Sequence, residues 1–152
     1  MALFTPHRYD IILQSPEGQF VAVVEIKNIQ DLSRDVATSI RRNSMTYSLL
    51  PQTPYFLLLS QDKGFLWKEA WREGPEAPPA YEFPMDTIVA CYTKKASNER
   101  LYDIELEFLV LQWLTELAEG KRKTNEEPEK TLARAGFDEA IQEARVAIGD
   151  DA

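Results

Sequence analysis

The sequence lacks several features that mark whole classes of protein. Among its 152 residues there is one cysteine, Cys91, so no disulfide can form within the chain and a reduced, cytoplasmic setting is expected. No apolar stretch approaches the roughly 18 residues that a membrane-spanning helix needs. The first residues show no basic region followed by an apolar run. We therefore expect neither a secretory signal nor a membrane partner.

Motifs for several kinds of chemistry are also missing. The chain has a single histidine, His7, no zinc-type spacing, no glycine-rich phosphate loop and no serine–histidine–aspartate set. His7 is expected to be a surface residue rather than a base. Cys91 has no activating neighbour in the sequence and is expected to be a small buried residue.

Positive charge is scarce but unevenly distributed. The net charge of −8 argues against a nucleic-acid partner. Residues 1–70 nevertheless carry seven acidic and seven basic side chains, so the whole acidic excess lies in residues 71–152. A neutral half can still present a local basic face. The residues available for it are Lys27, Arg34, Arg41, Arg42, Lys63 and Lys68.

The first half of the chain predicts a compact α/β arrangement. Two short apolar runs, residues 9–14 and 20–26, flank a Pro- and Gly-containing turn and predict a β-hairpin. Residues 31–50 predict a helix capped by Asp31 or Ser33, with Arg41 and Arg42 off its apolar face. Two further strands are predicted, at 55–59, buried on both faces, and at 63–67. The predicted order is β-β-α-β-β.

The second half predicts mainly helices. Residues 73–84 contain four prolines and are expected to form a loop, followed by a short helix at 86–95 capped by Asp86. Residues 99–119 predict a long helix that packs on the core or pairs with a second copy. Its predicted apolar stripe consists of Leu101, Ile104, Phe108, Leu111 and Leu114, widened by Leu106, Leu109, Val110 and Trp113.

The domain boundaries follow from these elements. We expect one domain at 1–120, with its core at 8–68 and a helical addition at 86–119. Residues 121–152 are expected to form a charged connection and a peripheral C-terminal helix over 130–148.

One strand ends in charged residues. Side chains alternate along a strand, so Val21, Val23, Glu25 and Lys27 are expected to share one face. If residues 16–19 form a four-residue loop, Ser15 faces Phe20. The same pairing then places Asp10 opposite Glu25, with directly opposed Cβ atoms roughly 4.5–5.5 Å apart.

Two carboxylates at that distance repel each other unless a cation lies between them. Carboxylate pairs of this kind bind Mg²⁺, with waters completing the octahedron. Lys27 could activate a metal-bound water or neutralise charge in the transition state. The alternative is an ordinary hairpin end, in which Glu25 and Lys27 lie at the solvent edge.

Asp10 followed by Glu25-Ile26-Lys27 resembles the PD-(D/E)XK, or restriction-endonuclease-like, nuclease superfamily over about 60 residues. The resemblance implies a restriction-endonuclease-like mixed sheet and hydrolysis of DNA or RNA phosphodiesters with Mg²⁺ or Mn²⁺. Asp10 and Glu25 would be the metal ligands and Lys27 the catalytic lysine. Tyr9 stands where the motif has proline. The helical glutamate that precedes the first strand in many members has no evident counterpart.

Two functions are therefore expected from different classes. The first is a divalent-metal-dependent nuclease, in which Arg34, Arg41 and Arg42 are placed to contact phosphate. The second is a catalytically inactive protein on the same fold that acts as an interaction module or subunit, including a homodimer formed through the 99–118 helix. The acidic second half favours the second function, and the Asp10, Glu25 and Lys27 set favours the first.

Overall fold

The computed structural model describes residues 9–47, 53–69, 74–95 and 99–149 of an α/β protein with a six-stranded mixed sheet. Within these residues the elements are β1 (Ile11–Gln14), β2 (Phe20–Ile26), α1 (Arg34–Tyr47), β3 (Tyr55–Leu59), β4 (Lys63–Lys68), β5 (Tyr81–Pro84), α2 (Asp86–Tyr92), α3 (Asp103–Ala118), α4 (Glu129–Arg134), α5 (Phe137–Ala140) and β6 (Arg145–Ile148). The strand order is β5-β4-β3-β2-β1-β6. Only β2 and β3 among these strands pair in parallel.

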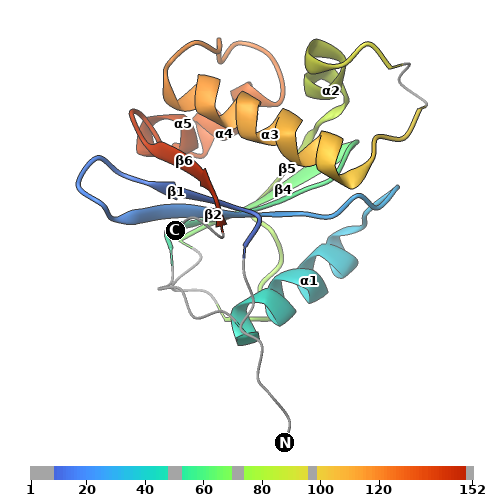
Figure 1. The fold of residues 1–152 in the computed structure, drawn as a ribbon. Helices are drawn as coiled ribbons and strands as arrows, with labels where there is room; N and C mark the ends of the chain where they lie inside the picture. The colour runs from blue at the N-terminus through green and yellow to red at the C-terminus, as the bar shows by residue number, and fades with distance from the viewer. Residues whose placement is uncertain (1–8, 48–52, 70–73, 96–98, 150–152) are drawn as a thin grey trace, which may run out of the picture.

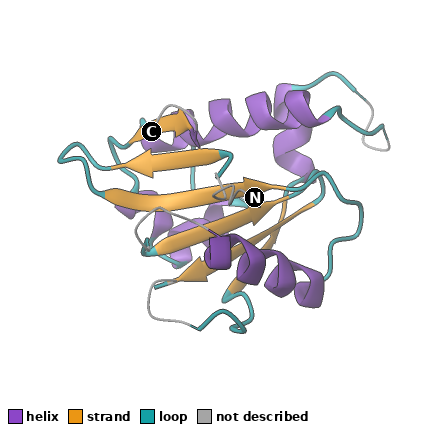
Figure 2. Ribbon diagram, turned by 60° about the horizontal axis from the view of Figure 1, so that its bottom comes forward, coloured by secondary structure: helices purple, strands orange, loops and turns teal. Residues whose placement is uncertain are grey.

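Helices cover both faces of the sheet. Figures 1 and 2 show α1 alone on one face, here called the α1 face, and α2 to α5 on the other, the α3 face. Alternating strand residues supply the two cores: Val23 and Phe56 pack on the α1 face, and Val24 and Leu57 on the α3 face. None of the helices in the described part of the chain is long and apolar enough to cross a membrane.

The predicted β-β-α-β-β order of the first half is confirmed, with one correction on α1. Ser33 caps this helix, because its hydroxyl accepts a hydrogen bond from the Val36 backbone N–H at 3.2 Å. Arg41 was predicted on the outer face but is fully buried. Its guanidinium lies 5.4 Å from the Trp67 ring centroid and donates to the Gly74 carbonyl. Flat stacking on an indole and a carbonyl acceptor allow burial of this cation, which a hydrophobicity pattern does not detect.

Two strands in the second half were not predicted. The proline-rich segment contains β5, which pairs with β4 at the edge of the sheet, where a proline is tolerated. The predicted helix over 130–148 is wrong: the chain forms α4 and α5 and then β6, which pairs antiparallel with β1. Helix α2 begins at Asp86, but Met85 holds the N-cap position and no side chain caps it.

The long helix α3 packs on the core, as predicted, but it begins later and buries only part of the wide predicted stripe. It starts at Asp103. Ile104 and Phe108 were predicted on the buried stripe, yet they are exposed. The buried face consists of Leu106, Leu109, Val110, Trp113, Leu114, Leu117 and Ala118. This helix is apolar around most of its circumference, so its spacing fits two faces and only tertiary packing chooses between them.

Candidate functional site

The regular pairing of β1 and β2 ends just before Asp10 and Glu25. Ile11 pairs with Val24, and this is the last pair of the register at that end of the hairpin. The Asp10 backbone N–H donates at 3.1 Å to the carbonyl of Val24, the residue already paired with Ile11, so the pairing is irregular at Asp10. The direct opposition of Asp10 and Glu25 stays a prediction, although Asp10 is near enough for its charge to raise the pKa of Glu25.

The turn reaches this register by a different route from the predicted one. Gln14, not Ser15, pairs with Phe20, and the register shifts between Leu13 and Gln14. The shift leaves Val21 as the extra residue of a bulge, and Val21 packs with the α3-face core instead of sharing the face of Val23. The predicted face of Val21 is wrong, but the bulge offsets the tighter turn and gives the predicted register from Leu13 to Ile11.

The Asp10 carboxylate lies beyond the end of β1, against the edge of β2. Its Oδ2 atom accepts a hydrogen bond from the Ile26 backbone N–H at 2.7 Å. This bond satisfies a β2 donor that β1 is too short to reach. The geometry holds the carboxylate at the point where the charged end of β2 begins.

Glu25 is buried, with 1% of its surface exposed. Burial in a low-dielectric environment, and to a lesser degree the negative charge of Asp10, raise the pKa of its carboxyl from 4.5 to about 8 against the opposing effect of Lys27. The Lys27 Nζ atom lies 3.9 Å from Glu25 Oε2, and its side chain is 43% exposed. Glu25 is therefore mainly protonated at neutral pH in the absence of another cation.

A small hollow of about 220 Å³ opens beside these residues. Asp10, Lys27 and Asn28 line it from the hairpin side, and Asp103 and Glu107 line it from α3. Glu25 is not among its lining residues, so Lys27 lies between the buried carboxylate and solvent. Asn28, Asp103 and Glu107 were not singled out from the sequence, and no sequence signal links α3 to the hairpin across some 75 positions.

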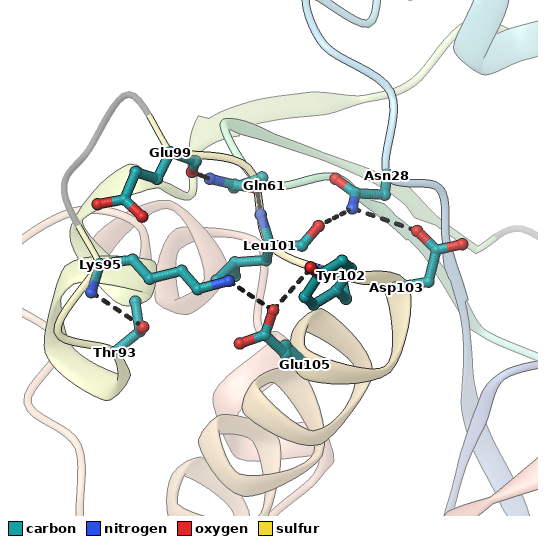
Figure 3. Close-up of polar contacts among 9 residues, drawn as sticks. All are labelled: Asn28, Gln61, Thr93, Lys95, Glu99, Leu101, Tyr102, Asp103 and Glu105. Atoms are coloured by element: carbon teal, nitrogen blue, oxygen red, sulfur yellow. Dashed lines mark hydrogen bonds and ion pairs between the residues drawn. The ribbon is translucent and has the colours of Figure 1, made fainter.

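The wall of this hollow is held in place by residues 99–102, here called the strap, which cross the ends of β2 and β3 (Figure 3). The Asn28 amide donates to the Leu101 carbonyl at 2.6 Å and to Asp103 Oδ1 at 3.2 Å. Gln61 donates to the Glu99 carbonyl at 2.6 Å and accepts from the Leu101 N–H at 2.8 Å. These side-chain hydrogen bonds connect the strap to the ends of β2 and β3, where no strand pairs with it, and they fix the start of α3.

Most of the basic residues expected to contact phosphate are paired with acids. Arg42 lies 3.1 Å from Glu76, and Lys63 lies 3.5 Å from Glu82. Arg34 lies 3.9 Å from the same Glu82. Arg41 is buried, so it cannot contact phosphate. Lys27 is the basic residue that lines the hollow itself.

Other predicted residues lie elsewhere. His7 falls outside the described residues. Cys91 was predicted to be buried but is exposed, because it lies on the outer side of the short helix α2. Within the described ranges, no three histidine, cysteine or acidic side chains are grouped closely enough to hold a metal ion. Asp10 and Glu25 thus form a two-carboxylate arrangement.

Comparison with known proteins gave no relative: no family model, no curated protein and no solved structure matches this chain.

Proposed function

We propose that the chain is a divalent-metal-dependent nuclease of the restriction-endonuclease-like kind, with Asp10, Glu25 and Lys27 as its site. The observation that carries the proposal is the meeting of these three residues at the end of a hairpin. The hairpin is followed by a helix and by β3, which is parallel to β2. An acid, then an acid and a lysine two residues apart, is the order of the restriction-endonuclease-like motif that the sequence resembles, and bound metal could assist phosphodiester hydrolysis there.

The residues present fit a hard cation. Both candidate ligands are carboxylates, and Mg²⁺ is commonly held by one or two carboxylates with waters. The raised pKa of Glu25 has two causes, burial and the charge of Asp10, and a cation between the carboxylates would oppose both. The pair is costly without a cation and favourable with one.

Each residue has a distinct part in the proposal. Asp10 and Glu25 would hold the ion, and a bound ion of this kind would supply Lewis-acid chemistry for phosphodiester hydrolysis. The hydrogen bond from the Ile26 N–H orients Asp10. Lys27, partly exposed on the wall of the hollow, offers its ammonium to the phosphate oxygens as negative charge develops.

The test combines cleavage with thermal melting. We expect the parent protein to cut generic DNA or RNA in Mg²⁺ or Mn²⁺ at pH 8.5 and to lose this activity with chelator. Lys27→Ala should abolish cleavage but keep the metal-dependent rise in Tm, because lysine is not a ligand. Asp10→Asn should lose both. Glu17→Gln, in the exposed turn, is the matched acidic control. Cleavage that survives Lys27→Ala and Asp10→Asn contradicts the proposal.

A second function, a catalytically inactive interaction module on this fold, is favoured by one specific observation. The basic side chains that would attract a nucleic acid are largely neutralised by Glu76 and Glu82. An inactive module predicts no binding to duplex or single-stranded nucleic acid even at low salt, whereas a nuclease predicts binding that weakens as salt rises.

A further inference from the structure

Helix α3 has a second apolar face whose side chains are exposed among the residues that the structure describes. Tyr102, just before the helix, is 75% exposed, and Ile104 and Phe108 are 60% and 57% exposed. Leu111 is partly buried. Ile104, Phe108 and Leu111 follow an i, i+4, i+7 spacing, so they form one stripe along the helix. These residues, with Tyr102, are called the outer stripe.

The start of the outer stripe is held rigidly. The strap before it is fixed by Asn28 and Gln61, and the Tyr102 backbone N–H donates to Glu105 at 2.8 Å (Figure 3). Lys95 lies 2.7 Å from Glu105 and 4.9 Å from the Tyr102 ring centroid. An ordered apolar surface loses little conformational entropy when a partner covers it.

The charge around the outer stripe selects the kind of partner. Helix α3 carries four acidic residues and no basic residue, and Asp103 and Glu107 lie close to the stripe in sequence. Like charges would meet if α3 packed against α3 of a second copy, which disfavours a homodimer through this helix. The same acids repel an anionic lipid surface. The surface that complements the outer stripe is therefore apolar at its centre with positive charges around it.

We propose that the outer stripe is the docking site for a basic amphipathic helix of a partner protein. Apolar side chains of that helix would cover Ile104 and Phe108, and its lysines or arginines would lie over Asp103 and Glu107. This mode buries an i, i+4, i+7 stripe against matching side chains, with charges at the rim. The inference goes beyond the nuclease proposal and does not depend on it.

The experiment uses two synthetic helical peptides on the full chain, one with leucine and lysine at amphipathic spacing and one with glutamate in place of lysine. We expect the lysine peptide to bind, more weakly as salt rises, and the glutamate peptide not to bind. Phe108→Ser should weaken binding by about tenfold or more, as loss of a central apolar anchor does. The matched control is Val36→Ser, because Val36 is 46% exposed but lies on α1, across the sheet.

Circular dichroism and melting should show that both variants stay folded, since the two side chains are exposed. Equal binding of the two peptides, no binding of either, or equal losses in Phe108→Ser and Val36→Ser would overturn the proposal. Sedimentation of the parent protein alone should show a monomer. A dimer that Phe108→Ser dissociates would show that a second copy occupies the stripe instead.

Discussion

Glu25 and Glu129 are both buried, but their surroundings differ in kind. Glu129, at the start of α4, accepts hydrogen bonds from the Trp113 indole at 3.1 Å and from the Arg122 guanidinium at 2.8 Å. Glu25, at the end of β2, has the Lys27 ammonium 3.9 Å away and faces the negative charge of Asp10. Glu129 therefore has two hydrogen-bond donors and a counter-charge at its carboxylate, whereas burial and the charge of Asp10 disfavour the ionised form of Glu25.

The largest effect on the free energy of unfolding should come from removing the Glu129 carboxylate. Glu129→Ala leaves the indole N–H without this acceptor and removes the counter-charge of a partly buried arginine. We expect the free energy of unfolding to fall by about 2–4 kcal/mol. Denaturant unfolding measures it. A loss below about 1 kcal/mol would show that Glu129 contributes no more to stability than an exposed ion pair does, and its contrast with Glu25 would fail.

Glu25→Gln should do the opposite at high pH. The folded pKa of about 8 exceeds the unfolded 4.5, so the folded protein retains a proton that the unfolded chain loses between these values. The free energy of unfolding of the parent thus falls as pH rises from 4.5 to 8. In chelator at pH 9 we expect Glu25→Gln to be more stable than the parent by about 2–4 kcal/mol, and near-equal to it at pH 4.5. Denaturant unfolding at both pH values measures it, and a pH-independent difference would contradict this.

Asp10→Asn should raise the free energy of unfolding by less than Glu25→Gln does, and it should shift the pH dependence of stability. The amide oxygen can still accept the bond from the Ile26 N–H, while the charge that raises the pKa of Glu25 is removed. We expect the stability of this variant to fall over a narrower pH window, ending below pH 8, with a gain of about 1 kcal/mol at pH 9. Unfolding across pH 5–9 measures the window. An unchanged window would mean that the two carboxylates do not interact.

Lys27→Ala should have the smallest effect on stability. The lysine lowers the pKa of Glu25, but it is 43% exposed and its attraction is screened by solvent. We expect a loss of at most about 1 kcal/mol at pH 9 and a weaker effect at high salt. Unfolding in low and high salt measures it. A larger, salt-independent loss would make Lys27 the structural partner of Glu25, in the way that Arg122 is for Glu129.

Sequence reasoning succeeded where the deciding interactions are local. The alternation along β2 and the turn residues were enough to predict the hairpin and its main register, even though the turn was assigned one residue too long. The bulge at Val21 compensates for that residue, and no pattern in the sequence indicates it.

The missed features depend on distant partners. Residues 145–148 follow an alanine- and glutamate-rich stretch that favours helix, and they become β6 only because β1 offers them a free edge. Asp103 and Glu107 reach the hollow because Asn28 and Gln61 hold the strap. Ile104 and Phe108 were predicted to be buried because α3 has two apolar faces, and the sequence does not indicate which of them packs on the sheet.

The most direct test of the two-carboxylate cation site is calorimetric titration of the parent protein with Mn²⁺ at pH 7, in buffers of different ionisation enthalpy. Glu25 is mainly protonated at this pH, so binding should release about one proton per ion. Glu25→Gln should release none and bind more weakly, and Glu17→Gln should match the parent. Absence of Mn²⁺ binding, or binding with the same proton release in Glu25→Gln, would contradict the assignment of Asp10 and Glu25 as metal ligands.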